Sequence, residues 1–468
     1  MSDSRMGRRD WMKLGGLGGA AAMLASCSQQ KKTPGAAGEV NGIIFMVADG
    51  MSHGVLTMAE NFSKIVHQRE TRWWQLIADS SAVRGLMETS SANSFVTDSA
   101  AASSAWGGGS KVNNRSINVR PDGTEAEPIL RFLKQRGRRT GLVTTATITH
   151  ATPAGFGAVS EKRDDEHLIA PQYAGVVDIL LGGGRRFFDP GKRIDSRDAR
   201  SVFIKNGYEY IEDRETLLKS KSRKVLGLFS DGHLPFEVDR LNDAALGQTT
   251  PSLSEMSEFA LNDFLYGNEK FLLQIEGGRV DHGAHSNDAA GLLWDQLAFD
   301  DALAKVLEMI DGRDDILVVV TSDHGNANPG LNGTGKEYGN SNDAFKGITR
   351  MTSSYERMLG EWNQAKEVSP EFLTDLVQRK LAFKLKPEEA AALFASLTEK
   401  PFIEWSNQLH NAHGLLGQFA GNHTGIGWTG TSHTSDPTMI SAIGPQAERF
   451  SGIVPNHEVH RHFVELLG

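Results

Sequence analysis

The fold class follows from the run Phe271-Leu272-Leu273-Gln274-Ile275-Glu276-Gly277-Gly278-Arg279-Val280-Asp281-His282-Gly283-Ala284-His285. Its first residues are mostly apolar, which is typical of a buried β-strand. Glu276, Asp281 and His285 come directly after them, and carboxylate and imidazole groups are the ligands of hydrolytic zinc and magnesium sites. Asp281 and His285 are four residues apart and can share one face of a helix. The run therefore predicts a buried strand that leads into a metal site.

The same pairing of an apolar strand with metal-binding side chains occurs twice more. Val318-Val319-Val320 leads into Thr321-Ser322-Asp323-His324, and Ile43-Ile44-Phe45-Met46-Val47 leads into Ala48-Asp49-Gly50. In open α/β sheets, ligands bind just beyond the carboxyl ends of the strands. The three segments together predict a metalloenzyme.

Apolar runs alternate with helical patterns along much of the chain. The runs are apolar nearly throughout, as in parallel sheets that helices cover on both faces. The clearest helix extends from Asp288 to Ile310, where apolar residues recur on one face. We therefore predict a three-layer α/β/α sandwich with a mostly parallel central sheet, whose strands cover 42–48, 141–146, 176–181, 271–275, 316–321 and 439–443.

Two stretches do not fit this alternation. Residues 185–240 are charged and irregular, and we interpret them as a surface excursion in which His233 is an ordinary loop histidine rather than a metal ligand. Residues 326–425 begin with a loop rich in glycine and asparagine and continue into helical patterns at 370–381 and 387–397. We interpret this second stretch as a helical insert that serves as a cap or an oligomer contact.

Composition excludes one class of function and leaves the number of domains open. The chain has 468 residues, of which 39% are hydrophobic and 23% charged, so either one large α/β domain or two to three smaller ones would be normal. Its formal net charge is −9. We therefore expect no binding of nucleic acid through the phosphate backbone.

The N-terminus is typical of an export signal. Arg8 and Arg9 precede a short, weakly apolar segment, as in a twin-arginine signal, and Cys27 follows Leu24-Ala25-Ser26, which looks like a lipoprotein cleavage box. We predict a signal over residues 1–27, a tether over 28–40 and a catalytic domain over 41–468. The mature protein would be periplasmic or at the cell surface, with membrane attachment through lipidated Cys27. Because Cys27 is the only cysteine, no intramolecular disulfide is expected.

Two further motifs can complete the site, although each is weak alone. Thr97-Asp98-Ser99-Ala100 places cap-type residues before a run of small residues, so Ser99 would stand at a helix N-terminus that favours an anion; an ordinary helix cap is the alternative. Thr431-Ser432-His433-Thr434 supplies a late histidine before the last predicted strand. Gly107-Gly108-Gly109-Ser110-Lys111 follows a predicted helix rather than a strand, and we interpret it as a turn.

Taken together, these motifs resemble the alkaline phosphatase family from about Gly42 to Pro445. The resemblance implies two zinc ions and one magnesium ion at the strand ends. It places Asp281, His285 and His433 around the first zinc and Asp323, His324 and Asp49 around the second. Asp49 would also contact magnesium, with Thr152 and Glu276.

The resemblance also implies the reaction. Ser99 would be the nucleophile that forms a phosphoserine, and Arg163 would bind two phosphate oxygens. Taken alone, the charged run Glu161-Lys162-Arg163-Asp164-Asp165 indicates that Arg163 is a solvated surface arginine. Its spacing from Thr152 along the chain, however, matches the family. The substrates would be a broad range of small phosphomonoesters, and the assembly would be a homodimer.

The sequence departs from the best-known bacterial pattern at two positions. His150 replaces an aspartate beside the magnesium site, and His282 replaces a lysine that contacts phosphate; neither is expected to bind zinc. Alternatives remain open: a phosphodiesterase or sulfatase of the same superfamily, or a non-catalytic surface lipoprotein that binds phosphate or metal. No sulfatase-type motif is present, and no ligand position of the family is lost.

Overall fold

The computed structural model describes residues 38–336, 338–400 and 406–468. The predicted signal, with Arg8, Arg9 and Cys27, lies outside these residues, as does most of the predicted tether. In the part of the chain that is described, no helix is both long and apolar enough to cross a membrane.

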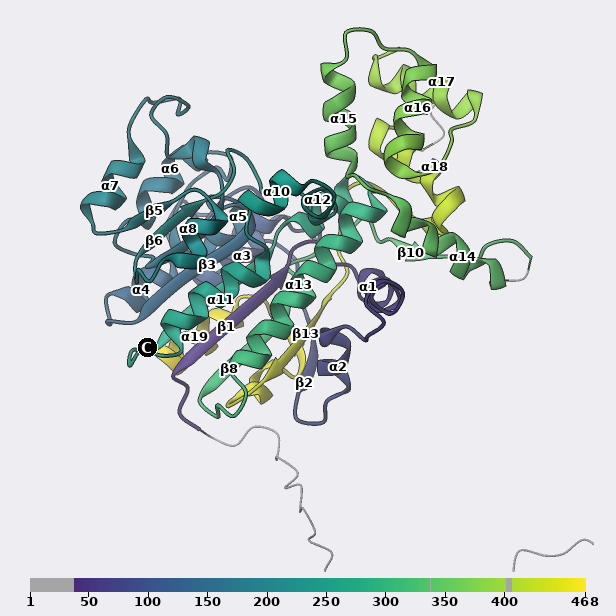
Figure 1. Cartoon of the computed structure of the whole chain (residues 1–468). Helices are drawn as coiled ribbons and strands as arrows, with labels where there is room; N and C mark the ends of the chain where they lie inside the picture. The colour runs from purple at the N-terminus through teal and green to yellow at the C-terminus, as the bar shows by residue number, and fades with distance from the viewer. Residues whose placement is uncertain (1–37, 337, 401–405) are drawn as a thin grey trace, which may run out of the picture. The chain divides into compact units, whose positions relative to one another are not determined.

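The described residues form a ten-stranded sheet in the order β14-β2-β13-β8-β1-β7-β3-β4-β6-β5 (Figure 1). Within it only β13 runs against its neighbours, so the sheet is mostly parallel, as predicted. The strands are β1 (Gly42–Ala48), β2 (Val83–Met87), β3 (Arg139–Thr147), β4 (Ile179–Gly183), β5 (Glu209–Ile211), β6 (Val225–Leu228), β7 (Phe271–Gly277), β8 (Ile316–Thr321), β13 (Thr438–Ile443) and β14 (Gly452–Val454).

Alternate residues of β1 belong to two different hydrophobic cores. Ile44 and Met46 pack in one core with the helices at Leu253–Phe264 and Ala289–Met309, whereas Ile43 and Phe45 pack in the other with the helices at Ile129–Lys134 and Glu458–Leu467. Successive side chains of a strand point to opposite faces of a sheet, so helices cover both faces. The predicted three-layer α/β/α sandwich is confirmed.

The helices have the following bounds: α1 (His53–Val66), α2 (Arg72–Ala78), α3 (Ser99–Gly108), α4 (Ile129–Lys134), α5 (Ala151–Gly157), α6 (Glu166–Ile169), α7 (Ala199–Lys205), α8 (Arg214–Lys219), α9 (Glu237–Asn242), α10 (Ala244–Thr249), α11 (Leu253–Phe264), α12 (Arg279–His285), α13 (Ala289–Met309), α14 (Ser341–Lys346), α15 (Tyr355–Gln364), α16 (Pro370–Leu381), α17 (Pro387–Leu397), α18 (Ala412–Thr424) and α19 (Glu458–Leu467). The predicted helix 288–310 is α13 with its two cap residues, because the Asp288 side chain accepts from the Gly291 amide. The predicted helices 370–381 and 387–397 are also confirmed.

Two sequence-based predictions need correction. The strand expected at 176–181 begins three residues later, at Ile179, because the amides of Val176 and Val177 bond to the Tyr173 carbonyl in a turn. The stretch 185–240 is not a surface excursion, since its strands β5 and β6 extend the sheet beyond β4. Both strands are short: β5 has three residues, and β6 is a four-residue apolar run directly after the charged Arg223-Lys224.

The helical stretch between β8 and β13 is held to the sandwich at both ends. Two short antiparallel pairs join its beginning to its end: Asn326 lies opposite His433, and Gly330 lies opposite Gly427. At the start of α15, the Tyr355 amide donates to the Asp288 carboxylate at 2.6 Å. His433 is therefore fixed beside the carboxyl end of β8, although more than a hundred residues of chain separate the two.

Candidate metal centre and active site

Three neighbouring strands deliver predicted ligands to one edge of the sheet. Their order is β8-β1-β7, and their carboxyl ends carry Asp323 with His324, then Asp49 and Glu276; Thr144 of the next strand, β3, lies opposite Glu276. The parallel register places Val47 opposite both Glu276 and Thr321, so the three strands end at the same level. This edge is where a parallel sheet binds its ligand.

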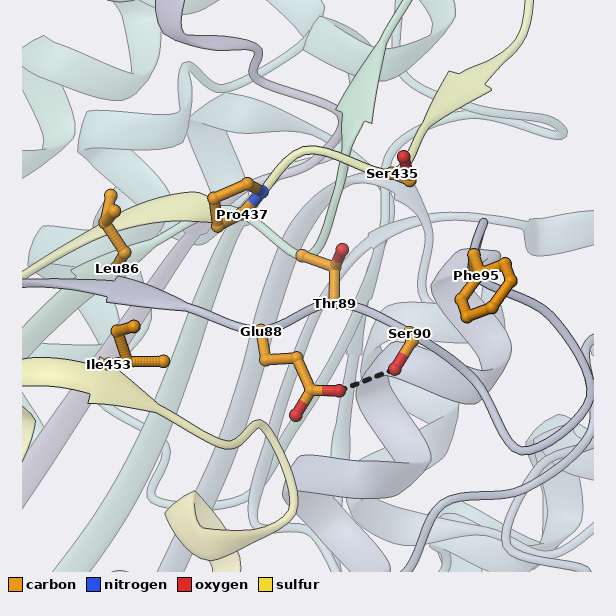
Figure 2. Close-up of a pocket in the computed structure, with 8 residues that line it drawn as sticks. All are labelled: Leu86, Glu88, Thr89, Ser90, Phe95, Ser435, Pro437 and Ile453. Carbon is orange, nitrogen blue, oxygen red and sulfur yellow. Dashed lines mark hydrogen bonds between the residues drawn. The ribbon is translucent and has the colours of Figure 1, made fainter.

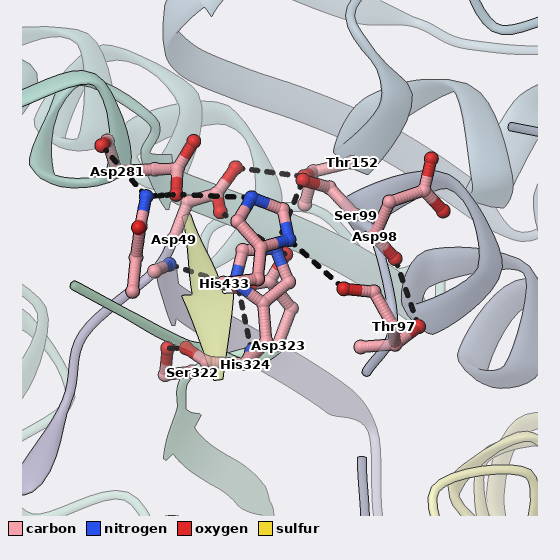
Figure 3. A network of polar contacts seen from close by, with 12 residues as sticks. Asp49, Thr97, Asp98, Ser99, Thr152, Asp281, Ser322, Asp323, His324 and His433 are labelled. Carbon is pink, nitrogen blue, oxygen red and sulfur yellow. Dashed lines mark hydrogen bonds and ion pairs between the residues drawn. The ribbon is translucent and has the colours of Figure 1, made fainter. Parts of the chain in front are cut away.

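The first cluster contains Asp281, His285 and His433. Asp281 and His285 lie one turn apart on α12, with the Asp281 Oδ2 atom 3.4 Å from the His285 Nε2 atom. The Nε2 atoms of His285 and His433 are 2.9 Å apart, and His433 Nε2 lies 3.6 Å from Asp281 Oδ1. Asp281, His324 and His433 also meet the spacing of a metal-binding group. The structure thus brings all the predicted members of this cluster together, and Figure 3 shows Asp281 and His433 among them.

The hydrogen bonds of His285 and His433 leave one ring nitrogen of each free to bind a cation. Each Nδ1 atom contacts a backbone carbonyl, that of Thr431 at 2.7 Å and that of Thr97 at 2.9 Å. A carbonyl only accepts, so Nδ1 carries the proton and Nε2 has a free lone pair when the ring is neutral. Two lone pairs then face each other beside a carboxylate. A metal ion fits this donor set, and the fixed Nδ1–H bonds are the usual support of histidine ligands.

The second cluster contains Asp49, Asp323 and His324, all fully buried. The His324 Nε2 atom lies 3.1 Å from Asp323 Oδ2 and 3.6 Å from Asp49 Oδ1. Neither carboxylate oxygen has a hydrogen-bond partner among the described residues. Burial raises the pKa of Asp49, and the neighbouring Asp323 and Asp281 carboxylates raise it further. A cation would supply the missing partners and stabilise the charged form.

The third cluster contains Asp49, Glu276 and His150. The Thr152 hydroxyl contacts Asp49 Oδ2 at 3.4 Å, and the Thr144 hydroxyl donates to Glu276 Oε2 at 2.5 Å. Glu276 Oε1 is buried without a partner in the described part of the chain. These oxygen atoms suit magnesium. The sequence pattern placed His150 outside the ligands, and the geometry adds it to the residues that could hold this ion.

Ser99 lies beside the second cluster. It is the first residue of α3, where the Asp98 carboxylate caps the helix by accepting from the Ala101 amide at 2.9 Å. The small residues of α3 let it pack against α5 so closely that a Cβ on Gly107 would lie 2.0 Å from the Gly155 carbonyl oxygen. This packing sets Ser99 Oγ 3.2 Å from His324 Nε2 (Figure 3). A hydroxyl in this position can reach the same ion as His324.

Arg163 is a site residue by position and not a solvated surface arginine. Its side chain is 16% exposed. Nη1 donates to Asp98 Oδ2 at 3.1 Å, and Nη2 donates to His150 Nε2 at 3.0 Å. Asp98 therefore links the N-terminus of α3, where Ser99 lies, to the Arg163 guanidinium. A guanidinium can bind two oxygens of a phosphate at once.

Several contact residues were not predicted from the sequence. Asn326 donates to Asp281 Oδ1 at 2.7 Å, and the buried Arg279 donates to His282 Nδ1 at 2.9 Å. His233, interpreted as an ordinary loop histidine, is also in this group because its ring lies 4.4 Å from that of His282. The sequence does signal the strand before His233, since Val225-Leu226-Gly227-Leu228 is again an apolar run followed by polar residues. It does not signal the place of that strand in the sheet.

A surface groove of about 410 Å³ contains none of the predicted site residues (Figure 2). It lies between the end of β2 and the segment before β13, and its lining includes Glu88, Phe95, Pro437 and Ile453. The Ser90 hydroxyl donates to Glu88 at 2.6 Å within it. The buried clusters at the strand ends, and not this groove, hold the groups that can do chemistry.

The carboxylates predict how metal-free protein responds to pH. Burial raises the pKa of Glu276 from 4.5 to about 7. Between these values the folded state binds more protons than the unfolded state, so the stability of metal-free protein falls as the pH rises through this window. We expect the Tm of chelated wild type to fall from about pH 5 to pH 7.5 more steeply than that of chelated Glu276→Gln, measured by calorimetry. Equal slopes would contradict the assignment of this carboxylate.

Comparison with known proteins identifies the family of this chain. The alkaline phosphatase family model matches residues 40–468. The chain belongs to the alkaline phosphatase family. It is a phosphatase, and the predicted recognition and enzyme class are confirmed. Alkaline phosphatases are metal-dependent, and the three clusters above are where this member offers ligands.

Similar alkaline phosphatases cover almost the whole chain. Alkaline phosphatase 3 of Bacillus subtilis is 30% identical over 457 residues, which is 96% of this chain and 93% of the relative. The crystal structure of Thermus thermophilus alkaline phosphatase superposes with a TM-score of 0.86 at 32% identity and covers 96% of both chains. A mutant of the alkaline phosphatase from the Antarctic bacterium TAB5, with magnesium bound in its M3 site, shares the fold at 21% identity and a TM-score of 0.64, over 92% of this chain and 98% of its own.

Proposed function

We propose that this phosphatase hydrolyses a broad range of small phosphomonoesters through a phosphoserine on Ser99. The observation that carries the proposal is the 3.2 Å contact between Ser99 Oγ and His324 Nε2, in a cluster whose buried oxygens lack other partners. A hydroxyl at this position can act as a nucleophile, because it lies beside the metal ligands and directly follows Asp98, which Arg163 contacts.

Two zinc ions and one magnesium ion would occupy the clusters. Asp281, His285 and His433 offer nitrogen and oxygen atoms to the first zinc, and Asp49, Asp323 and His324 offer them to the second. Asp49, Thr152 and Glu276 offer only oxygen, which favours magnesium. Bound metal would lower the pKa of the attacking hydroxyl or water and offset the charge of the leaving oxygen.

The protein's own groups then perform two displacements. Ser99 Oγ gives up its proton and attacks phosphorus; the new P–O bond replaces the bond to the leaving group, which departs as the alcohol after gaining a proton. A water molecule next attacks the phosphoserine; the bond to Ser99 breaks, one proton of the water returns to Ser99 Oγ, and the remaining hydroxyl leaves as part of inorganic phosphate. Arg163 donates from two nitrogens to non-bridging oxygens in both steps, which matters because the charge of a loose transition state lies there.

The test compares two chromogenic substrates with the same leaving group, a phosphomonoester and its phosphodiester. Purified protein with zinc and magnesium should hydrolyse the monoester with the larger kcat/KM. In the diester, one of the non-bridging oxygens that Arg163 and the metals would bind is esterified instead. A larger kcat/KM for the diester would favour the phosphodiesterase alternative, and turnover of neither would favour a binding protein.

The magnesium site gives a prediction about His150. A carboxylate there would add negative charge beside Asp49 and Glu276, whereas the imidazole accepts from Arg163 and adds none. We expect His150→Asp to lower the magnesium concentration for half-activation about tenfold in zinc-loaded protein. His167→Asp, at a half-buried position of α6 outside the three clusters, is the matched control. A midpoint that does not change, or that changes equally in the control, would contradict the assignment.

We also propose export by the twin-arginine signal and lipid attachment at Cys27. The support is the order Arg8-Arg9, weakly apolar segment and Leu24-Ala25-Ser26-Cys27. Activity in the native host should fractionate with membranes, Cys27→Ser should move it to the soluble fraction or leave uncleaved precursor, and replacing both arginines by lysine should keep it in the cytoplasm. Soluble activity unchanged by Cys27→Ser would contradict lipidation.

A homodimer completes the proposal, on the support of the family resemblance alone. The mass of the purified catalytic region in solution tests it, and a monomeric mass at micromolar concentration would exclude a stable dimer.

A further inference from the structure

The segment after β6 crosses the same sheet edge as the metal clusters. The Phe229 amide donates to the Gly182 carbonyl at 2.9 Å, and the Gly184 amide donates to that of Gly232 at 2.8 Å. The segment is pressed against β4, since a Cβ on Gly183 would lie 2.1 Å from the Gly232 oxygen. These contacts fix the position of the next residue, His233, next to the active site.

The hydrogen bonds of His233 and His282 define which ring nitrogen carries a proton. His233 Nδ1 accepts from the Thr147 backbone amide at 3.0 Å, and His282 Nδ1 accepts from the Arg279 guanidinium at 2.9 Å. Both partners can only donate, so each neutral ring carries its proton on Nε2. The two rings lie 4.4 Å apart, and each lies 5.6 Å from the ring of His150, which Arg163 contacts. Two fixed N–H donors therefore stand beside the arginine that would hold phosphate.

A guanidinium without a directly paired carboxylate extends this group of donors. Arg186 forms no ion pair with any residue in the described ranges, although its charge acts on the Glu166 carboxylate, which accepts from the Thr147 and Thr149 hydroxyls. The Arg186 Nη1 atom lies 4.0 Å from where a Cβ on Gly232 would be.

The pKa of His233 is lowered to about 3, first by burial and then by the charges of Arg279 and Arg186. The charge of Arg186 therefore acts at His233. Because its Nδ1 atom accepts from the Thr147 amide, His233 is a neutral donor, and it lies beside the half-buried His282 and one residue from Gly232, which the exposed Arg186 approaches.

We propose that His233, His282 and Arg186 form an anion subsite that binds a second phosphate group next to the one held by Ser99 and Arg163. Neutral N–H donors and an unpaired guanidinium, with no carboxylate bonded to them, suit the oxygens of a phosphate. The inference rests on the proposed function. The second phosphate has two possible sources: the neighbouring phosphate of a diphosphate substrate, or the inorganic phosphate that leaves the site.

Two substitutions of His233 separate binding from structure. The amide of His233→Gln reaches the Nε2 position and keeps a donor in the subsite, but it loses the acceptor for Thr147. His233→Asn keeps an acceptor near the Nδ1 position and loses the donor. Arg186→Gln removes the guanidinium, and Arg136→Gln is its matched control, because Arg136 is also exposed and lies over a phenylalanine ring, at the opposite edge of the sheet.

The experiment measures KM and kcat of metal-loaded enzyme for a nucleoside diphosphate and the matching monophosphate, together with the inhibition constant of inorganic phosphate. For His233→Asn and Arg186→Gln we expect the ratio of the two KM values, diphosphate over monophosphate, to rise about tenfold, with a change below about threefold for His233→Gln and Arg136→Gln. This result identifies the substrate's second phosphate as the ligand.

A rise of the inhibition constant alone, with the same order among the variants, supports the subsite and identifies the outgoing phosphate as its ligand. The inference is overturned if neither quantity moves in His233→Asn, if His233→Gln is as impaired as His233→Asn, or if Arg186→Gln matches its control. Wild-type enzyme that hydrolyses neither nucleotide would instead overturn the proposed function.

Discussion

Replacing Ser99 by alanine is expected to lower kcat by roughly four orders of magnitude or more, because the variant lacks the atom that bonds to phosphorus. Bound zinc and magnesium should stay near wild-type amounts. The reason is that Ser99 Oγ contacts His324, while Asp49 and Asp323 still provide the buried carboxylates of that cluster. Metal content by mass spectrometry and a phosphoenzyme trapped at low pH with labelled substrate are the measurements.

A serine on the same helix is the control for this change. Ser104 is also buried in α3 but bonds to Asn118, away from the metal clusters. Ser104→Ala should still form the labelled phosphoenzyme. Label that persists in Ser99→Ala would assign the nucleophile to another residue.

Removal of metal is expected to abolish hydrolysis, and zinc plus magnesium should restore it. Without a cation, two histidine lone pairs face each other at 2.9 Å, and Asp49 is buried among Asp323, Asp281 and Glu276, so that burial and these carboxylates raise its pKa. The assay is monoester turnover after prolonged chelation and after each metal is added back. Chelator already saturated with zinc is the control, and full activity in excess free chelator would contradict the metal assignments.

The centre of the fold was predictable because its strands are buried on both faces. Gly42–Ala48 and Ile316–Thr321 have the predicted bounds, and every residue in them is buried. Strands near the two margins of the sheet were missed for the opposite reason: β2, next to the edge strand β14, reads Val83-Arg84-Gly85-Leu86-Met87 and is only partly buried, and β5, at the other edge, has three residues. A strand with solvent on one side carries no continuous apolar run.

The site was predictable where a ligand directly follows a central strand or shares a helical turn. Asp49, Asp323 and the pair Asp281 and His285 are of this kind. His233 was not, because its place beside His282 depends on β6 lying next to β4 in the sheet, an order that the sequence does not state. Asn326 was missed because an asparagine in a glycine-rich loop has many ordinary uses.

The pairing of Asn326 with His433 makes the region between them a closed loop whose ends stay adjacent whatever its contents. Loop-closure entropy grows only slowly with length, so residues can be added to or removed from the far part of this region without moving His433 relative to Asp281. Members of the family could therefore differ widely here in size while keeping the same catalytic centre. The same property makes this stretch a natural place to insert a foreign binding module into the enzyme.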